Sequence, residues 1–280
     1  MSPAASTALP SGDRLMVPSD EGPSSLALRR DGRSALVTGA GGGTGRAIAL
    51  ALAQAGARVM LLGRTRSTLE ETAAEIAELS PSAPAPLVRP CDVTDAAAVH
   101  ALICTLDRLD IVVNNAGSNV PCRFVDVDDA DLDALIDLNL RAVYVVAQAA
   151  ARRMLELADR RERSAAIVNV SSQMGHVGAP ERSVYCMTKH GVEGLTKAMA
   201  VELAPQGIRV NSLAPTFVDT PLIRRIVDTE DKRASLLSRI PMGRMASERE
   251  IALAALYLAS DAAAMVTGTS LLVDGGWTAQ

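Results

Sequence analysis

Short apolar runs alternate with longer helical patterns along most of this chain of 280 residues, and that alternation constrains its fold more than any other feature. The runs with the length and composition of buried strands are 34–38, 58–63, 86–89, 110–114, 165–171, 208–213 and 269–274. The amphipathic or alanine-rich stretches that predict helices are 44–55, 67–79, 95–106, 129–158, 184–204 and 247–259. Apolar strands separated by helices are typical of a parallel sheet covered on both faces. The pattern predicts an α/β fold, a Rossmann-type doubly wound, seven-stranded parallel sheet with helices on both faces.

The apolar periodicity begins only near residue 31, so we expect a single domain over residues 31–280 behind a flexible extension of residues 1–30. The extension is rich in Ser, Pro and Ala and shows no periodic apolar face that a core could bury. It also lacks the apolar centre of a secretory signal, so we expect a cytoplasmic protein. The stretch 80–86, SPSAPAP, is too short to divide the chain, and we interpret it as a loop.

Composition argues against several classes of function. The chain carries 28 basic and 32 acidic residues, and its net charge of −4 gives no reason to expect nucleic acid or an anionic membrane as a partner. We expect no membrane span, because no apolar run approaches the roughly 18 residues that one needs. The cysteines form no C-x-x-C pair and the histidines show no ligand spacing, so we expect reduced thiols and no metal site.

A glycine cluster follows the first predicted strand directly, in the sequence TGAGGGTGRA. Gly39, Gly43 and Gly45 would let backbone N–H groups approach a pyrophosphate, and the helix that begins near Thr44 would direct its positive end at it. A glycine cluster alone would equally fit a structural turn. Because this one lies between a first strand and a first helix, it indicates a dinucleotide site.

The end of the second predicted strand bears on which dinucleotide is bound. An acidic residue there usually binds the ribose 2′-hydroxyl, whereas an arginine accommodates a 2′-phosphate. Here the strand ends in Gly63, followed by Arg64 and then Arg66. We therefore expect NADP(H) to be preferred, with NAD(H) still able to bind. The alternative is that both arginines are solvated loop residues.

Tyr185 is one of three tyrosines in the chain, and Lys189 follows it at a spacing of four. On a helix the two residues lie one turn apart. A phenol with a pKa near 10 must lose about 3 units to act as a base near neutrality, and a nearby ammonium supplies most of the roughly 4 kcal/mol required. The pair predicts a tyrosine that exchanges a proton, with its pKa lowered by Lys189. The alternative is ordinary packing of a half-buried tyrosine.

These motifs, with several others in the same order, resemble the short-chain dehydrogenase/reductase family over residues 31–280. The others are CDVTD (91–95), NNAG (114–117), LNL around Asn139, NVSS (169–172), APTFVDT (214–220) and LLVDGGW (271–277). The chain departs from the family at Thr44, where isoleucine is usual, and at Thr216, where glycine is common. The family spacing of thirteen residues before Tyr185 favours Ser172 over the adjacent Ser171 as the active serine.

The resemblance implies an enzyme that interconverts a secondary alcohol and a ketone by hydride transfer with NAD(P). The implied catalytic residues are Ser172, Tyr185, Lys189 and Asn139. The implied cofactor-binding residues are Gly39, Gly43, Thr44, Gly45, Arg64, Asp92, Val93, Asn115, Ala116, Gly117, Tyr185, Lys189, Pro215, Val218 and Thr220. Tyr185 would supply the proton, and Ser172 would hydrogen-bond the carbonyl oxygen. Lys189 would also hold the nicotinamide ribose, and Asn139 would anchor a water that relays protons.

The sequence constrains the identity of the substrate less than it constrains the reaction and the cofactor. Its pocket is expected among residues 118–123, 173–182 and 216–240, and the last of these segments has the character of a lid. The arginines there that could bind a carboxylate or a phosphate are Arg123, Arg182, Arg224 and Arg225. His176 could contact substrate or simply fill a loop. We expect a small polar hydroxy or keto compound of sugar, polyol or 3-oxoacyl type.

Three other classes of protein share parts of this pattern. A non-catalytic dinucleotide sensor would keep the glycine turn but has no need of Ser172, Tyr185 and Lys189. A dehydratase or epimerase on the same fold would show no net redox. A zinc-dependent alcohol dehydrogenase would need clustered Cys and His ligands, which the sequence lacks.

We also expect a homotetramer, or at least a dimer. The stretches 129–158 and 184–204 carry more alanine and apolar surface than one sheet face needs for cover. The family commonly pairs its subunits through these helices, so this expectation rests mostly on analogy.

A truncated chain that starts near Leu26 should keep the melting temperature and the kcat of the full chain. The reason is the composition of the removed segment, which offers nothing for a core to bury. Thermal melts and steady-state kinetics of both chains make the comparison. A fall of more than a few degrees would mean that the segment packs on the body or on a neighbouring subunit.

Overall fold

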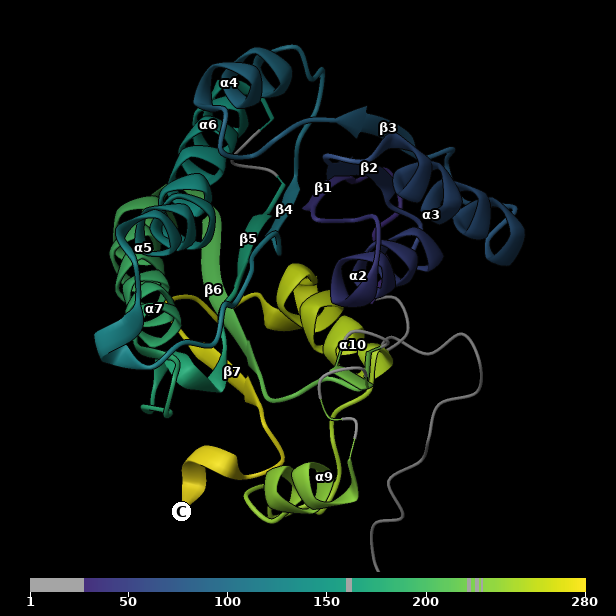
Figure 1. Cartoon of the computed structure of the whole chain (residues 1–280). Coiled ribbons are helices and arrows are strands. Elements are labelled where there is room, and N and C mark those ends of the chain that lie inside the picture. The colour runs from purple at the N-terminus through teal and green to yellow at the C-terminus, as the bar shows by residue number, and fades with distance from the viewer. Residues whose placement is uncertain (1–27, 160–162, 221–222, 225–226, 228) are drawn as a thin grey trace, which may run out of the picture.

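The structure, a computed structural model, describes residues 28–159, 163–220, 223–224, 227 and 229–280 (Figure 1). Seven strands form one sheet in the order β3-β2-β1-β4-β5-β6-β7, and every neighbouring pair is parallel. They are β1 (Ser34–Thr38), β2 (Arg58–Gly63), β3 (Leu87–Pro90), β4 (Ile111–Asn114), β5 (Ala165–Val170), β6 (Ile208–Pro215) and β7 (Ser270–Val273). The order reverses at β1, which pairs with β2 on one side and with β4 on the other. The predicted doubly wound parallel sheet is thereby confirmed.

Apart from α9, which none of the predicted helical stretches covers, the helices begin and end within a few residues of the predicted ones. They are α2 (Gly43–Gln54), α3 (Arg66–Leu79), α4 (Ala96–Cys104), α5 (Asp129–Ile136), α6 (Ala142–Glu156), α7 (Ser183–Leu203), α9 (Glu230–Leu237) and α10 (Glu248–Ala259). The largest difference concerns 129–158, which the pattern predicts as one helix. There α5 and α6 are joined by a π-helical segment, Asp137–Arg141. Such segments are rare and are frequently found at functional sites.

The sheet separates two layers of helices (Figure 1). The first layer, α2, α3 and α10, covers one face, and α4 to α7 cover the other. Side chains of β1 alternate between the two cores: Ala35 and Val37 pack toward the first layer, and Leu36 packs toward the second. Because both faces are covered, every residue of β4, β5 and β6 is buried. This explains why the strands are continuous apolar runs in the sequence.

The stretch Asp129–Glu156 is long and apolar enough to cross a membrane, judged by length and composition alone. Charged residues interrupt the apolar residues of this stretch, so the sequence contains no continuous apolar run of that length. In the fold, α6 buries a face that includes Val146, Ala150 and Met154 in the same core as α4 and β4. We therefore interpret the stretch as a core helix of the second layer.

The segment 216–240, expected to be a lid, is described only in part. Residues 221–222, 225–226 and 228 lie outside the described residues, as do residues 1–27 of the expected extension. The described part contains α9, which begins after the N-cap Thr229 and buries none of its residues. In Figure 1 α9 lies away from the two helix layers, below α10.

Candidate active site

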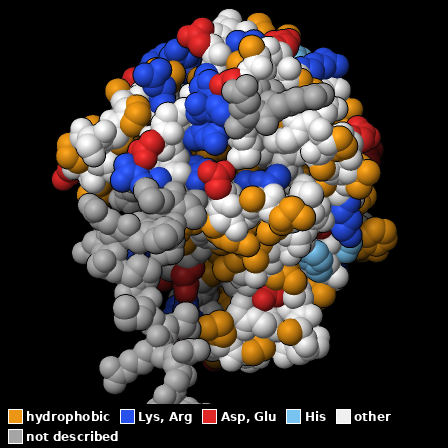
Figure 2. Space-filling model, turned by 180° about the vertical axis from the view of Figure 1, so that it is seen from behind, with side chains coloured by type: hydrophobic (Ala, Val, Ile, Leu, Met, Phe, Trp, Pro, Cys, Tyr) orange, Lys and Arg blue, Asp and Glu red, His pale blue; other side chains and the backbone are white. Residues whose placement is uncertain are grey.

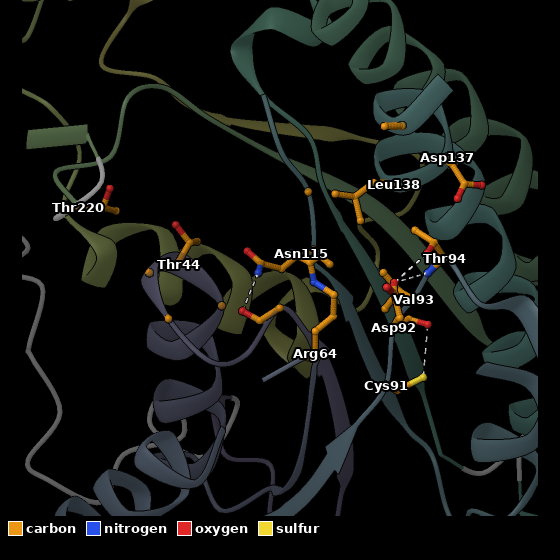
Figure 3. A pocket seen from close by; sticks show the side chains of 18 residues that line it. Thr44, Arg64, Cys91, Asp92, Val93, Thr94, Asn115, Asp137, Leu138 and Thr220 are labelled. Carbon is orange, nitrogen blue, oxygen red and sulfur yellow. Dashed lines mark hydrogen bonds between the residues drawn. The ribbon is translucent and has the colours of Figure 1, made fainter. Parts of the chain in front are cut away.

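Two cavities open at the carboxyl ends of the strands, where the strand order reverses. The first has a volume of about 850 Å³ and the second about 380 Å³. The residues that line both are Thr44, Asn115, Gly117 and Thr220. Figure 3 shows Thr44 and Thr220 at one end of the first cavity and Asp92 and Asp137 at the other, with Arg64 between them. Every residue predicted to bind the cofactor lines one of the two cavities.

The turn after β1 brings its backbone very close to the segment that follows β4. A Cβ atom on Gly45 would collide with the Gly39 carbonyl oxygen and with the Asn115 side chain. Gly39 and Gly43 have φ angles of +66° and +53°, which side chains other than glycine's disfavour. The N-cap of α2, Gly42, has no side-chain cap, and the first turn holds no acidic residue, so its N–H groups are available to a phosphate. This cradle fits the pyrophosphate of a dinucleotide.

Thr38, the last residue of β1, ties the glycine turn to the end of β4. Its hydroxyl oxygen accepts hydrogen bonds from the N–H groups of Asn115 at 2.9 Å and Ala116 at 3.0 Å. The Asn115 amide donates in return to the Thr38 carbonyl oxygen at 3.0 Å. The Asn115 side chain therefore lines the cavity and also holds the segment after β4 to the end of β1. Sequence reasoning missed Thr38, although its position just before the first glycine of the turn was a usable signal.

Arg64 and Asp92 place a cation and a carboxylate in the first cavity. Arg64 directly follows β2, is exposed and lines the cavity near Asp92. The Thr94 N–H and hydroxyl donate to the Asp92 carboxylate at 3.0 and 2.8 Å, and these bonds, aided by the charge of Arg64, lower its pKa. Arg66 is not among the lining residues, and its guanidinium pairs with Glu70 at 3.5 Å. Of the two arginines in this loop, only Arg64 is placed to contact a nucleotide.

Ser172, Tyr185 and Lys189 meet in the second cavity. Ser172 lies just after β5, and the other two lie one turn apart near the start of α7, as their spacing predicts. The Ser172 side chain interacts with the Tyr185 phenol and acts to lower its pKa, and the Ser172 oxygen accepts from the Met174 N–H at 3.1 Å. The hydroxyl of the adjacent Ser171 has no partner among the described residues. The contact with the phenol therefore belongs to Ser172.

Burial changes the acidity of Lys189. Its Nζ donates to the Val170 carbonyl oxygen at 2.8 Å and lies 5.6 Å from the centroid of the Tyr185 ring. Burial lowers the pKa of Lys189 to about 8, an effect partly opposed by the charge of Glu193 one turn further along α7. An amine with this pKa can gain or lose a proton close to neutral pH.

Lys189 lies close enough to Tyr185 for its charge to act on the phenol, and the interpretation that it lowers the pKa of Tyr185 stays a prediction. Burial raises the pKa of the Tyr185 phenol, and the hydrogen bond with Ser172 and the charge of Arg182 oppose that rise. Tyr185 therefore keeps its proton at neutral pH.

Asn139 lies fully buried in the π-helical segment, so it is not a helix-surface amide. Its Nδ2 donates to the Ser118 carbonyl oxygen at 2.8 Å, and its Oδ1 accepts from the Ser118 N–H at 2.9 Å. A Cβ atom on Gly117 would lie 3.1 Å from Asn139 Oδ1 and 3.8 Å from Lys189 Nζ. Asn139 thus holds the chain after β4 in a fixed position beside Lys189.

The arginines considered for substrate binding lie in different surroundings. Arg182 lines the second cavity. Arg123 and Arg224 are exposed and each is paired with an aspartate, at 2.5 and 2.7 Å. Arg225 lies outside the described residues. Only Arg182 of this group is therefore shown next to the predicted catalytic residues.

His176 contacts a buried carboxylate and lines neither cavity. Its Nε2 lies 2.9 Å from the Ser270 hydroxyl and 3.4 Å from Glu193 Oε1. Glu193 also accepts from the Ser212 hydroxyl at 2.6 Å, so its charge is held by hydrogen bonds inside the protein. Sequence reasoning missed Glu193, and its position one helical turn after Lys189 was the only signal for it.

Within the described ranges, no group of three or more His, Cys, Asp or Glu side chains is arranged to hold a metal ion. The four cysteines, Cys91, Cys104, Cys122 and Cys186, are free thiols.

Known proteins resemble this chain along nearly all of its described length. A family model described as enoyl-(acyl carrier protein) reductase matches residues 39–278. L-xylulose reductase of Bos taurus is 40% identical over 262 residues, which cover 91% of this chain and 100% of that one. A short-chain type dehydrogenase/reductase from Mycobacterium marinum is 36% identical with a TM-score of 0.83, and the match covers 91% of this chain and 98% of that one. A gluconate 5-dehydrogenase from Burkholderia cenocepacia J2315, in complex with NADP and tartrate, is 34% identical with a TM-score of 0.84 and covers 92% of this chain and 99% of its own. The chain therefore belongs to the short-chain dehydrogenase/reductase family.

Proposed function

We propose that this oxidoreductase interconverts a secondary alcohol and a ketone by hydride transfer with NAD(P), acting on a small polar compound of sugar or polyol type. The observation that carries the proposal is that Ser172, Tyr185 and buried Lys189 line one cavity, next to a second cavity that fits a dinucleotide. The relatives are named as a reductase and dehydrogenases, which favours net redox over a dehydratase or an epimerase. A 3-oxoacyl substrate is the second candidate, because the matching family model is described as an acyl-carrier-protein reductase.

The proton chemistry follows from Tyr185 and Ser172. A bound reduced nicotinamide supplies hydride to the carbonyl carbon, so the chain must supply the proton for the oxygen. Tyr185 carries that proton because burial raises the pKa of its phenol. Ser172 is placed to hydrogen-bond the same oxygen and to stabilise the charge that develops on it. Because an alkoxide is a much stronger base than a phenolate, the transfer stays favourable, and the arrangement favours reduction near neutral pH.

Lys189 and Asn139 have supporting roles in this proposal. Lys189 uses one of its three donors on Val170 and keeps the others for the ribose of the cofactor. Its pKa of about 8 also suits it to return a proton to Tyr185. Both ends of the Asn139 amide are bonded to Ser118, which favours positioning of that segment over the anchoring of a relay water.

We also propose that NADP(H) is the preferred cofactor. The residue that ends β2 is Gly63, so no carboxylate stands there to bind a 2′-hydroxyl or to repel a 2′-phosphate. Arg64 lines the cavity and offers a planar fork of donors to a phosphate. The structure of the Burkholderia cenocepacia relative holds NADP, which supports this choice.

Tyr185→Phe should nearly abolish turnover and leave cofactor binding largely intact, because the ring still packs but has no proton to give. Steady-state kcat and a titration with the cofactor measure the two effects. Tyr144→Phe is the matched control, since Tyr144 is 50% exposed on α6 and lines neither cavity. A Tyr185→Phe variant that kept a tenth of the wild-type kcat would show that another group carries the proton.

Arg64→Ala should shift the kcat/KM ratio toward NAD(H) by roughly ten- to hundredfold, the contribution of a charge-assisted hydrogen bond. Arg66→Ala is its control, because that guanidinium pairs with Glu70. Gly63→Asp should shift the ratio in the same direction by at least about tenfold. A Cβ at this position would lie 3.2 Å from Leu69, so Gly63→Ala measures the effect of crowding alone. A wild type that already prefers NAD(H) would contradict the assignment.

We propose a cytoplasmic homotetramer that has neither nucleic acid nor a membrane as its partner. Apolar side chains are exposed on α6 and α7 (Tyr144, Met187 and Val201) and again near α10 and β7 (Leu253, Met265 and Leu272), which would suit two separate contacts between subunits. Figure 2 shows hydrophobic side chains gathered in the lower half of one face and basic side chains above them, next to acidic ones. Light scattering should give four times the mass of one chain, and a monomer at micromolar concentration would end this proposal.

A further inference from the structure

Polar atoms without hydrogen-bond partners gather at the second cavity. Of the seven buried side-chain nitrogen and oxygen atoms that lack a partner among the described residues, four belong to residues that line this cavity. They are Ser171 Oγ, Gln173 Oε1, Arg182 Nε and Thr216 Oγ1. An unpartnered buried polar atom costs free energy, and native proteins keep few of them. Their concentration here indicates a ligand that carries several polar groups.

The charged residues that line the second cavity indicate the sign of the ligand's charge. The described residues that line the cavity include the cations Arg182 and Lys189 and no carboxylate. Lys189 is bonded to Val170, whereas the exposed Arg123 and Arg224 are paired with aspartates elsewhere. A cavity lined by charges of one sign concentrates ligands of the other sign. The lining therefore favours an anion, with Arg182 as its partner.

The chain holds the Arg182 guanidinium ready for such a contact. Glu181 has a φ of +59°, a strained conformation that no other non-glycine residue in the described ranges adopts and that tends to occur at functional sites. Its carbonyl oxygen accepts from the Cys122 N–H at 3.1 Å and from Arg182 Nη1 at 3.0 Å. One nitrogen of the guanidinium is thus anchored, and the buried Nε is left for a ligand. A guanidinium presents its donors as a fork that matches the two oxygens of a carboxylate.

Arg182 also lies close to the reacting group. It is the N-cap of α7, Tyr185 follows three residues later, and both side chains line the second cavity. The charge of Arg182 lowers the pKa of the Tyr185 phenol, so the two groups interact. A ligand whose oxygen contacts Tyr185 and Ser172 would therefore place a group only a few bonds away against Arg182.

Resting on the proposed function, we propose that the substrate is a small polyhydroxylated carboxylate whose carboxylate binds Arg182 and whose hydroxyl groups bind Gln173 and Thr216. An amide and a hydroxyl can each donate and accept, so they match substrate hydroxyls without adding charge. The volume of about 380 Å³ is within the range of small-molecule sites. The carboxylate takes no part in the redox step, which is that of the proposed function.

The test compares aldonates of four to six carbons with alditols of the same length and configuration, using the full chain and NADP⁺. Turnover gives kcat/KM, and calorimetry gives the affinity of each compound for the complex of enzyme and NADP⁺. We expect at least one aldonate to have a kcat/KM about tenfold or more above that of its matched alditol, and to bind the complex of enzyme and NADP⁺ more tightly by a similar factor. Arg182→Gln should remove this advantage, mainly through KM. Arg182→Lys should keep part of it, because the charge stays while the fork is lost.

Two further variants complete the design. Arg123→Gln is the matched control, because its arginine lies outside both cavities and its loss should leave the aldonate advantage unchanged. Gln173→Leu should weaken aldonates and alditols alike, because it removes a contact with a hydroxyl group only. The melting temperature and the NADP⁺ affinity of each variant separate a lost contact from a lost fold. If Arg182→Gln does not fold, the aldonate advantage of the wild type is compared with that of Arg182→Lys instead.

The outcomes separate this inference from the proposed function. Alditols used as well as aldonates, or an aldonate advantage that survives in Arg182→Gln, would overturn the inference and leave the redox function in place. Tighter binding of an aldonate through Arg182 without any turnover would support the inference and overturn the proposed function.

Discussion

The contact between the ends of β1 and β4 is the constraint on which the site depends. The glycine turn passes so close to Asn115 that a single added Cβ at Gly45 would collide with it, and the Thr38 hydroxyl joins the two ends by hydrogen bonds to main-chain N–H groups. Because the strand order reverses at this pair, a crevice opens beyond the carboxyl ends of the strands. The hydrogen bonds of Thr38 that join the two strand ends also fix Asn115 and Ala116, which line the first cavity.

A second level of organisation comes from α7 and the residue before it. Tyr185, Lys189 and Glu193 follow one another at spacings of four, so a phenol, an ammonium and a carboxylate succeed each other along one face of α7, and Arg182 is the N-cap of the same helix. Burial then acts on them in opposite directions, raising the pKa of the phenol and lowering that of the ammonium. α7 and its N-cap residue therefore carry the group proposed to donate the proton, the group proposed to resupply it and the group proposed to bind the substrate.

Most of the fold could be predicted because the apolar runs of buried strands and the apolar repeat of helices are both patterns among residues that are close in the sequence. Buried strands of a parallel sheet are continuous apolar runs, and their predicted ends differ from the observed ones by only one or two residues. The π-helical segment Asp137–Arg141 was not predicted, since an inserted residue leaves no mark in composition. That segment matters, because it lets Asn139 reach Ser118 across the gap between two elements.

The sequence by itself determined which residues share the site: the helical repeat places Lys189 one turn after Tyr185, and the motif spacing selects Ser172. Only the tertiary structure decided what those groups do to one another. Burial raises the pKa of the Tyr185 phenol and lowers that of Lys189, whose Nζ donates to the Val170 carbonyl oxygen. Desolvation and Coulomb energies depend on distances between segments far apart in the chain, and local spacing carries no information about them.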